Sequence, residues 1–123
     1  MILGIGVDIV EVQRLEKTVT RFGNRFLNRV FTEQEIAYSM SKTHSYQKLA
    51  SRFAAKEAAF KALGTGVTTW KEAETTIEPS GKPNLKLHGQ AAAHAGSLGV
   101  VRNHISASDT ERHAVAVVVL EGE

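Results

Sequence analysis

Apolar and polar residues alternate along the chain with different periods and predict five strands and five helical segments. Strands are expected at about residues 2–12, 75–77, 84–88, 104–108 and 113–121, where β-branched residues gather or apolar and polar side chains alternate. Helical segments are expected at about residues 12–20, 25–31, 33–40, 46–63 and 90–98. No repeat, linker or low-complexity tract divides the chain, so the pattern predicts a single α+β domain over residues 1–123.

Capping and turn residues define several of the predicted boundaries. Thr32 and Glu35 fit a capping box at the start of a helix. Gly64 follows the longest helix and suits the left-handed conformation of a C-cap. The run Pro79–Pro83 predicts a turn between two strands, and Gly99 ends the alanine-rich last helix.

Composition excludes several classes of protein. The chain of 123 residues has a formal charge of only +2, less than a dedicated nucleic-acid binder needs. It has no cysteine, which excludes disulfides, thiolate metal sites and a cysteine nucleophile. No segment approaches the roughly 18 consecutive apolar residues that span a bilayer, and the first ten residues lack the basic leader of a secretory signal. We therefore expect a cytoplasmic protein whose partners include neither nucleic acid nor a membrane.

Several familiar motifs occur only in part. The G-x-G pairs at Gly4–Gly6 and Gly64–Gly66 lack the third glycine of a dinucleotide fingerprint. Gly81-Lys82 lacks the other residues of a P-loop. The five histidines show no zinc-ligand spacing on one helix.

Two carboxylates stand in apolar surroundings. Asp8 lies inside the most apolar stretch of the N-terminal half, and aspartate is seldom buried without a partner. On the longest helix, Glu57 falls on the apolar side, about 80° from Leu49. Simpler interpretations remain open, because Asp8 can point to solvent or pair with a lysine, and Glu57 can form a surface pair with Lys61.

Together the two acids suggest a site for a hard cation. Magnesium prefers oxygen ligands and usually takes one or two carboxylates together with substrate phosphates and waters. Asp8 and Glu57 would supply the carboxylates, and Lys61 would neutralise charge on the transferred phosphoryl group or its leaving group. Small residues surround Glu57 and Lys61 on this helix: Ala54, Ala55, Ala58, Ala59 and Ala62. They would let another backbone or a ligand approach the helix closely, and the plain alternative is that alanine is simply a good helix former.

Five motifs follow one another along the chain: G-I-G-V-D-I-V-E with Arg14, F-T-E-Q-E at Phe31–Glu35, R-F-A-A-K-E-A-A-F-K-A-L-G-T-G at Arg52–Gly66, Ser80–Pro83 and His104–Ser106. In kind and order they resemble the motifs of bacterial holo-acyl-carrier-protein synthases, and the resemblance covers nearly the whole chain. It implies the 4′-phosphopantetheinyl transferase fold, in which a mostly antiparallel sheet packs with one long central helix and shorter helices.

The resemblance implies a magnesium-dependent transfer of 4′-phosphopantetheine from coenzyme A to a serine of apo-acyl carrier protein, for fatty acid biosynthesis. The serine would attack the β-phosphorus and release adenosine 3′,5′-bisphosphate. Asp8, Glu57 and Lys61 would be catalytic, and Asp8 and Glu57 would coordinate the magnesium ion. Glu57, or a water that it orients, would accept the serine proton. Coenzyme A would contact Arg52, Lys61, Gly64, Gly81, Lys82, Pro83 and His104.

The resemblance also implies a homotrimer with active sites at subunit interfaces. Leu85–Leu87 and Val115–Val119 offer apolar surfaces for packing between subunits. One position departs from the family pattern, since many relatives carry a histidine where this chain has Asp109. An acid–base role for that position is therefore open.

Basic residues recur at steps of three or four in the first two helical segments, at Arg14, Lys17, Arg21, Arg25 and Arg29. If Gly23-Asn24 does not bend the chain sharply, they form one basic stripe. The plain alternative is a solvated helix face. Because acyl carrier proteins are acidic, the resemblance implies that Arg14, Arg21 and Arg25 contact the carrier protein.

The residues alone leave two other functions open. A non-enzymatic basic module that binds an acidic protein or RNA would need the arginines but would have no use for Asp8 and Glu57. A magnesium-dependent nucleotide hydrolase would use both acids, with water as the acceptor. The resemblance favours the transferase.

Overall fold

The long helix α4 (Ser45–Leu63) lies at the centre of the computed structural model, which describes residues 1–123. Most of its 19 residues are buried, because other elements pack around much of its circumference. A helix in this position needs small or apolar residues on most sides, which explains its many alanines. The predicted C-cap is confirmed, since Gly64 adopts the left-handed conformation with φ of 77°.

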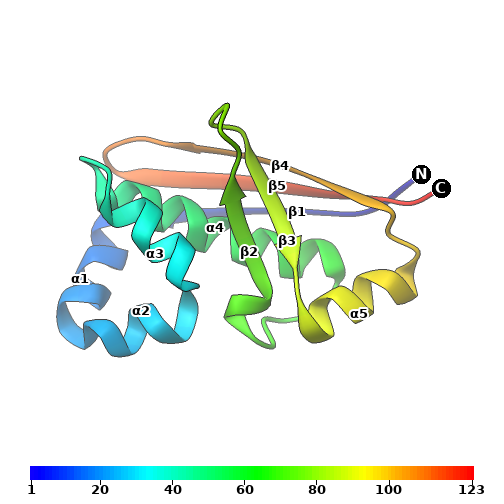
Figure 1. Cartoon of the computed structure of the whole chain (residues 1–123), viewed down its shortest axis with the longest axis horizontal. Coiled ribbons are helices and arrows are strands. Elements are labelled where there is room, and N and C mark those ends of the chain that lie inside the picture. Colours follow the sequence, from blue (N-terminus) through cyan, green and yellow to red (C-terminus); the bar gives the residue numbers. More distant parts are fainter.

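Three strands form an antiparallel sheet on one side of α4, in the order β1-β5-β4 (Figure 1). They are β1 (Ile2–Glu11), β4 (Arg102–Asp109) and β5 (His113–Glu121). Two shorter strands, β2 (Ala73–Ile77) and β3 (Pro83–Leu87), form a separate antiparallel hairpin. In the larger sheet β5 is central and β1 is an edge strand, so a site beside β1 is accessible from the edge.

The other helices lie on the same side of the three-stranded sheet as α4 and leave the opposite face of the sheet bare (Figure 1). None of the helices has the length and apolar character that crossing a membrane requires. Together with the strands, they confirm the predicted α+β class. The helices are α1 (Val12–Phe22), α2 (Asn24–Val30), α3 (Glu33–Met40), the short 3₁₀ helix η1 (Trp70–Glu72) and α5 (Gly89–Leu98).

Glycines allow β1 to lie directly on α4. Side chains alternate along a strand, so Gly4, Gly6 and Asp8 share the face that points to the helix. A Cβ atom on Gly6 would lie 1.9 Å from the carbonyl oxygen of Ala58, and one on Gly4 would lie 2.0 Å from that of Ala62. Only glycine fits at these two positions. The alanines of α4 permit the close approach of a backbone, as expected from the sequence.

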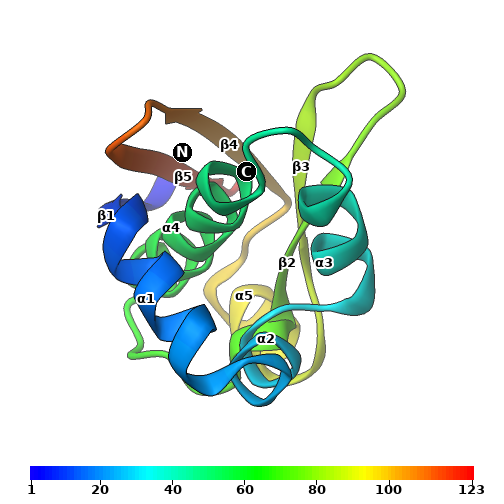
Figure 2. The same ribbon diagram turned by 90° about the vertical axis from the view of Figure 1, so that its left-hand side faces the viewer.

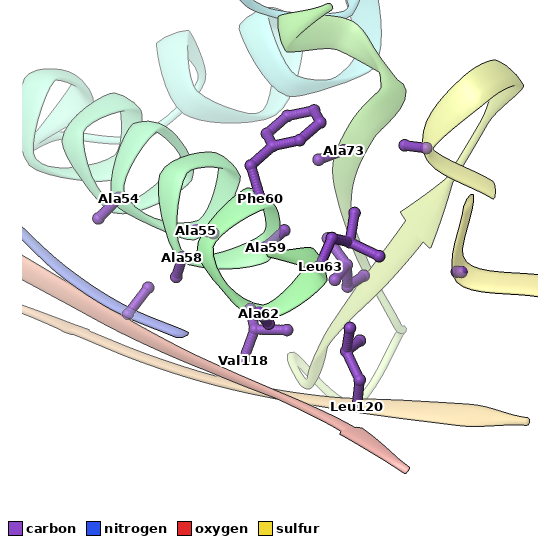
Figure 3. Packing of buried hydrophobic residues seen from close by; sticks show 14 residues of the cluster. Ala54, Ala55, Ala58, Ala59, Phe60, Ala62, Leu63, Ala73, Val118 and Leu120 are labelled. Atoms are coloured by element: carbon purple, nitrogen blue, oxygen red, sulfur yellow. The ribbon is translucent and has the colours of Figure 1, made fainter. Parts of the chain in front are cut away.

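Two apolar clusters hold the elements around α4. The first lies between α4, β5, the hairpin and α5, and includes Phe60, Leu63 and Leu120 (Figure 3). The second joins α1 and α2 to the first half of α4, and includes Leu15 and Phe31. Because the second cluster anchors α1, it also fixes the position of α1 beside β1.

A buried ion pair ties α3 to α4. Nζ of Lys56 lies 2.7 Å from Oε1 of Glu35, and both side chains are fully buried. Lys56 also donates a hydrogen bond to the carbonyl oxygen of Ala73, while Glu35 accepts hydrogen bonds from the backbone N–H groups of Thr32 and Thr75. Burial lowers the pKa of Lys56 and the charge of Glu35 opposes that shift. The predicted capping box of Thr32 and Glu35 is confirmed, but its buried lysine partner was not predicted.

The first strand was predicted to be buried, and it is buried on one face only. Ile5, Val7 and Ile9 point away from α4 and are 64%, 53% and 65% exposed. The pairing of β1 with β5 extends this apolar surface, because Val7 lies opposite Val117. We define the outer sheet face by the six β-branched residues that share it: Ile5, Val7, Ile9, Val115, Val117 and Val119.

Two further expectations fail. Leu85 belongs to the core of its own chain, so Leu85–Leu87 is not a free packing surface. The condition for a single basic stripe is not met, because Gly23 ends α1 with φ of 59° and ψ of −139° and the chain turns into α2 (Figure 2). The basic residues are therefore divided between Arg14, Lys17 and Arg21 on α1 and Arg25 and Arg29 on α2.

Replacing Gly6 by alanine tests the contact between β1 and α4. The added methyl group would overlap the backbone of α4, so we expect Gly6→Ala to lower the free energy of unfolding by about 3 kcal/mol or more. Gly96→Ala is the matched control, since a Cβ there meets nothing within 4 Å and alanine favours a helix. Denaturant unfolding measures both. A Gly6→Ala protein as stable as wild type would contradict the close contact.

Candidate active site

Asp8 and Lys61 meet where β1 lies on α4. Nζ of Lys61 lies 3.0 Å from Oδ1 of Asp8 and 3.0 Å from the carbonyl oxygen of Val7. The side chain of Asp8 is 13% exposed, whereas that of Lys61 is 55% exposed. The sequence left open whether Asp8 points to solvent or pairs with a lysine, and in the structure it pairs with Lys61. Lys61 pairs with Asp8 and not with Glu57.

Asp8 and Glu57 line the same pocket, of about 550 Å³. Burial raises the pKa of the Glu57 carboxyl group above its ordinary value of 4.5, the charge of Asp8 raises this pKa further, and Lys61 opposes the shift. The two acids are thus close enough to disfavour each other's negative charge. Such a pair favours a bound cation.

The donor set fits a hard cation that brings further ligands with it. The chain has no group of three or more histidine, cysteine or acidic side chains that could hold a metal ion by themselves. One or two carboxylates are the usual protein contribution to a magnesium site, in which phosphate oxygens and waters complete the octahedron. Asp8 and Glu57 are the residues that could hold the ion here.

Apolar residues line much of this first pocket beside the acids. These apolar residues are Leu15 of α1, Phe26 of α2 and Phe53 of α4. Phe53 lies one turn before Glu57. Arg14 of α1 also lines the first pocket. Sequence reasoning did not assign these three apolar residues to a site. The available signal was Phe53, which shares the apolar side of the helix with Glu57.

A second pocket, of about 140 Å³, lies between α3, α4, the β2–β3 hairpin and β4. Arg52 lines this pocket, and the Cζ atom of its guanidinium group lies 4.5 Å from the centroid of the Tyr38 ring. Burial lowers the pKa of Arg52. Its Nε and the hydroxyl of Thr75 are buried without hydrogen-bond partners. A buried guanidinium group with a free N–H suits an anionic ligand such as a phosphate group.

Asp109 also lines the second pocket, not the first. Its Oδ2 lies 3.2 Å from Nζ of Lys48, an ion pair that was not predicted. Within one chain Asp109 therefore belongs with Arg52 and Lys48, and it does not line the pocket of the two acids.

His104 lies on the opposite face of the sheet from Asp8. Ile105 packs against the core, so its neighbour His104 points to the outer sheet face, where its Nε2 is 2.9 Å from Oε1 of Glu121. A ligand bound at Asp8 cannot contact His104 of the same chain without passing around the sheet.

One chain therefore brings together only part of the predicted site. The first pocket gathers Asp8, Glu57 and Arg14, with Lys61 bound to Asp8. The second pocket gathers Arg52, Gly81 and Pro83. Neither pocket is lined by the remaining predicted residues, all of them exposed: Gly64, Lys82, His104, Arg21 and Arg25.

Comparison with known proteins shows the family of the chain. The family model of the 4′-phosphopantetheinyl transferase superfamily matches residues 4–118. A holo-[acyl-carrier-protein] synthase of Koribacter versatilis is 52% identical over 124 residues, covering 98% of this chain and 99% of that protein. The crystal structure of the synthase from Neisseria meningitidis superposes with a TM-score of 0.90 at 34% identity, covering 98% of this chain and 99% of that one. The crystal structure of the Helicobacter pylori synthase in complex with coenzyme A superposes with a TM-score of 0.84 at 31% identity, covering 95% of this chain and 99% of that one.

The family model, the relatives and the fold thus define a transferase of the phosphopantetheine class, as the motifs implied. The chain belongs to the 4′-phosphopantetheinyl transferase superfamily and, within it, to the holo-[acyl-carrier-protein] synthases.

The electrostatics of the acid pair predict a pH-dependent gain in stability for Glu57→Gln. Because the pKa of Glu57 is raised in the folded protein, folding disfavours its ionised form and the free energy of unfolding is lowered. This loss of stability is absent well below pH 4.5 and complete above the pKa of Glu57 in the folded protein. Without added metal, Glu57→Gln should match wild type in unfolding free energy at low pH and exceed it at neutral pH. The gain should shrink in an Asp8→Asn background, which lacks the repelling charge. A Glu57→Gln protein less stable than wild type at neutral pH would contradict this electrostatic picture.

Proposed function

We propose that this chain transfers 4′-phosphopantetheine from coenzyme A to a serine of an apo-acyl carrier protein, in a magnesium-dependent reaction of cytoplasmic fatty acid biosynthesis. The observation that carries the proposal is the pocket shared by Asp8 and Glu57, with Lys61 bound to Asp8. The relatives named above as holo-[acyl-carrier-protein] synthases support the acceptor, and the relative solved with coenzyme A supports the donor.

In this proposal Asp8 and Glu57 hold the magnesium ion together with the diphosphate of coenzyme A. When bound, the ion withdraws charge from the phosphate oxygens and so favours attack at phosphorus. Lys61 contacts the phosphates and neutralises charge on the departing nucleotide. The exposed stem of Lys61 gives its ammonium group the freedom to reach them.

The chemical step replaces the phosphoanhydride bond of coenzyme A by a phosphoester bond to the serine. The serine oxygen forms a bond to the β-phosphorus, and the bond from that phosphorus to the bridging oxygen breaks. Adenosine 3′,5′-bisphosphate leaves with the electron pair. Glu57, or a water that it orients, accepts the serine proton.

The second pocket is our proposed site for the nucleotide portion of coenzyme A. Arg52 is buried there with a free N–H, and Gly81 and Pro83 line the same pocket. Lys82, between them, is exposed at the same turn. Gly64 and His104 complete the proposed set of coenzyme A contacts, although neither lines this pocket.

The outer sheet face and the divided site both support association of subunits, which we propose to be the homotrimer that the family resemblance implies. Ile5, Val7 and Ile9 form an apolar surface that no element of the chain covers, and exposed surfaces of this kind mark interfaces. The first pocket adjoins the edge strand β1, whereas the second adjoins β4 at the other edge of the same sheet. In a cyclic assembly the β4 edge of one subunit can lie against the β1 edge of the next, so that one molecule of coenzyme A contacts both pockets.

The carrier protein is proposed to dock on α1 and α2. Arg14 lines the first pocket, and Arg21 and Arg25 are exposed on either side of the turn at Gly23. A basic surface next to the acids attracts an acidic partner and guides its serine toward the phosphorus. The apolar wall formed by Leu15 and Phe53 can bury an apolar side chain of that partner.

A mass measurement tests the activity directly. Incubation with apo-carrier protein, coenzyme A and Mg²⁺ should add one phosphopantetheine group to the carrier protein. Asp8→Asn and Glu57→Gln should both remove this activity, by about a hundredfold or more, and retain a native circular dichroism spectrum. Cleavage of coenzyme A without a mass gain on the carrier protein would identify a hydrolase instead.

Charge reversal at Arg14 tests the docking surface. Arg14→Glu places a negative charge where the acidic partner binds, so the KM for carrier protein should rise by about tenfold or more while that for coenzyme A stays nearly constant. Lys86→Glu, on the exposed side of β3, is the control and should change neither value. Equal changes in both KM values for Arg14→Glu would count against this surface.

Complementation between two inactive variants tests the shared site. Asp8→Asn removes a proposed metal ligand, and Lys82→Glu repels the nucleotide. Co-expressed chains with different tags should form mixed trimers in which some sites combine an intact Asp8 with an intact Lys82 from the neighbouring subunit. We expect a substantial return of activity in the doubly purified fraction. Mixed trimers without activity would mean that both residues serve the same site from one chain.

A further inference from the structure

Lys61 holds its positive charge against Asp8, one of the two proposed metal ligands. Its ammonium group makes two contacts of 3.0 Å, one with Oδ1 of Asp8 and one with the carbonyl oxygen of Val7. These two oxygens belong to adjacent residues at the edge of β1, so the ammonium group bridges carboxylate and backbone oxygens as a hard metal ion does. No other lysine, arginine or histidine forms an ion pair with Asp8.

The two ends of this ion pair differ in freedom. The side chain of Asp8 is 13% exposed and is held against α4, whereas that of Lys61 is 55% exposed. A lysine stem has four rotatable bonds and its ammonium group is a compact charge. Lys61 can therefore leave Asp8 by rotating its own side chain, without any movement of the strand or the helix.

Charge determines when Lys61 leaves. The site of the free protein holds the negative charges of Asp8 and Glu57 and the positive charge of Lys61. A divalent ion at the two carboxylates would face the ammonium group at close range, which disfavours binding of the metal alone. A diphosphate brings compensating negative charge and a new partner for the ammonium group.

We propose that Lys61 acts as an internal counter-ion that competes with the metal for Asp8 and moves to the phosphates when coenzyme A binds. The inference rests on the proposed function and adds an order of events to it. Lys61 keeps metal affinity low in the free protein, and coenzyme A raises it by giving Lys61 another partner. Metal and coenzyme A thus bind cooperatively, and by linkage each strengthens the other by the same factor.

Binding of Mn²⁺ measured by electron paramagnetic resonance, with and without saturating coenzyme A and without carrier protein, tests this competition. Lys61→Met removes the charge and keeps a similar length, and a circular dichroism spectrum equal to that of wild type checks that the fold is kept. Without coenzyme A, Lys61→Met should bind Mn²⁺ about tenfold more tightly than wild type. Addition of coenzyme A should strengthen Mn²⁺ binding more for wild type than for Lys61→Met. Lys61→Arg keeps the charge and should stay close to wild type.

The outcomes separate the two levels of the account. If coenzyme A strengthens Mn²⁺ binding equally in wild type and Lys61→Met, and both bind Mn²⁺ equally without it, the competition is wrong while the proposed metal site stands. If neither protein binds Mn²⁺ even with coenzyme A, the proposed metal site fails, and the competition fails with it.

Discussion

The contact between the backbone of β1 and α4 is the constraint on which the rest of the structure depends. Gly4 and Gly6 leave no room for side chains between strand and helix, and the small residues of α4 supply the matching surface. Asp8 follows on the same face of the strand, so it meets the last turns of the helix, where Glu57 and Lys61 lie. A looser contact would separate the two acids. The position of the site is therefore a consequence of backbone packing.

The same strand links the site to assembly. While Gly4, Gly6 and Asp8 face α4, the alternate residues form an apolar surface that a single chain leaves bare. The two pockets adjoin opposite edges of this sheet, and His104 lies on its outer face. A second subunit against these surfaces would cover apolar side chains and join the pockets. Folding of one chain and completion of its active site are, on this account, separate steps.

Much of the fold could be predicted from local signals. The capping box at Thr32 and the periodicity around it predicted a helix over 33–40, which the structure confirms. The pairing of Lys56 with Glu35 could not be predicted, because contacts between residues 21 apart in the chain leave no local period. Strand β1 was misjudged for a related reason. Glycines alternating with isoleucine and valine resemble a continuous apolar run, although only the glycine face is buried in one chain. The site could be anticipated in part, since an acid in apolar surroundings is a visible signal, whereas Leu15, Phe26 and Phe53 resemble ordinary core residues.

The most direct measurement of the central claim is a crystal structure of the protein with Mg²⁺ and coenzyme A. The account predicts one ion with carboxylate oxygens of both Asp8 and Glu57 at about 2.0–2.1 Å, and with oxygens of the coenzyme A diphosphate in the same octahedron. An ion bound elsewhere, or a diphosphate that contacts neither acid, would contradict it.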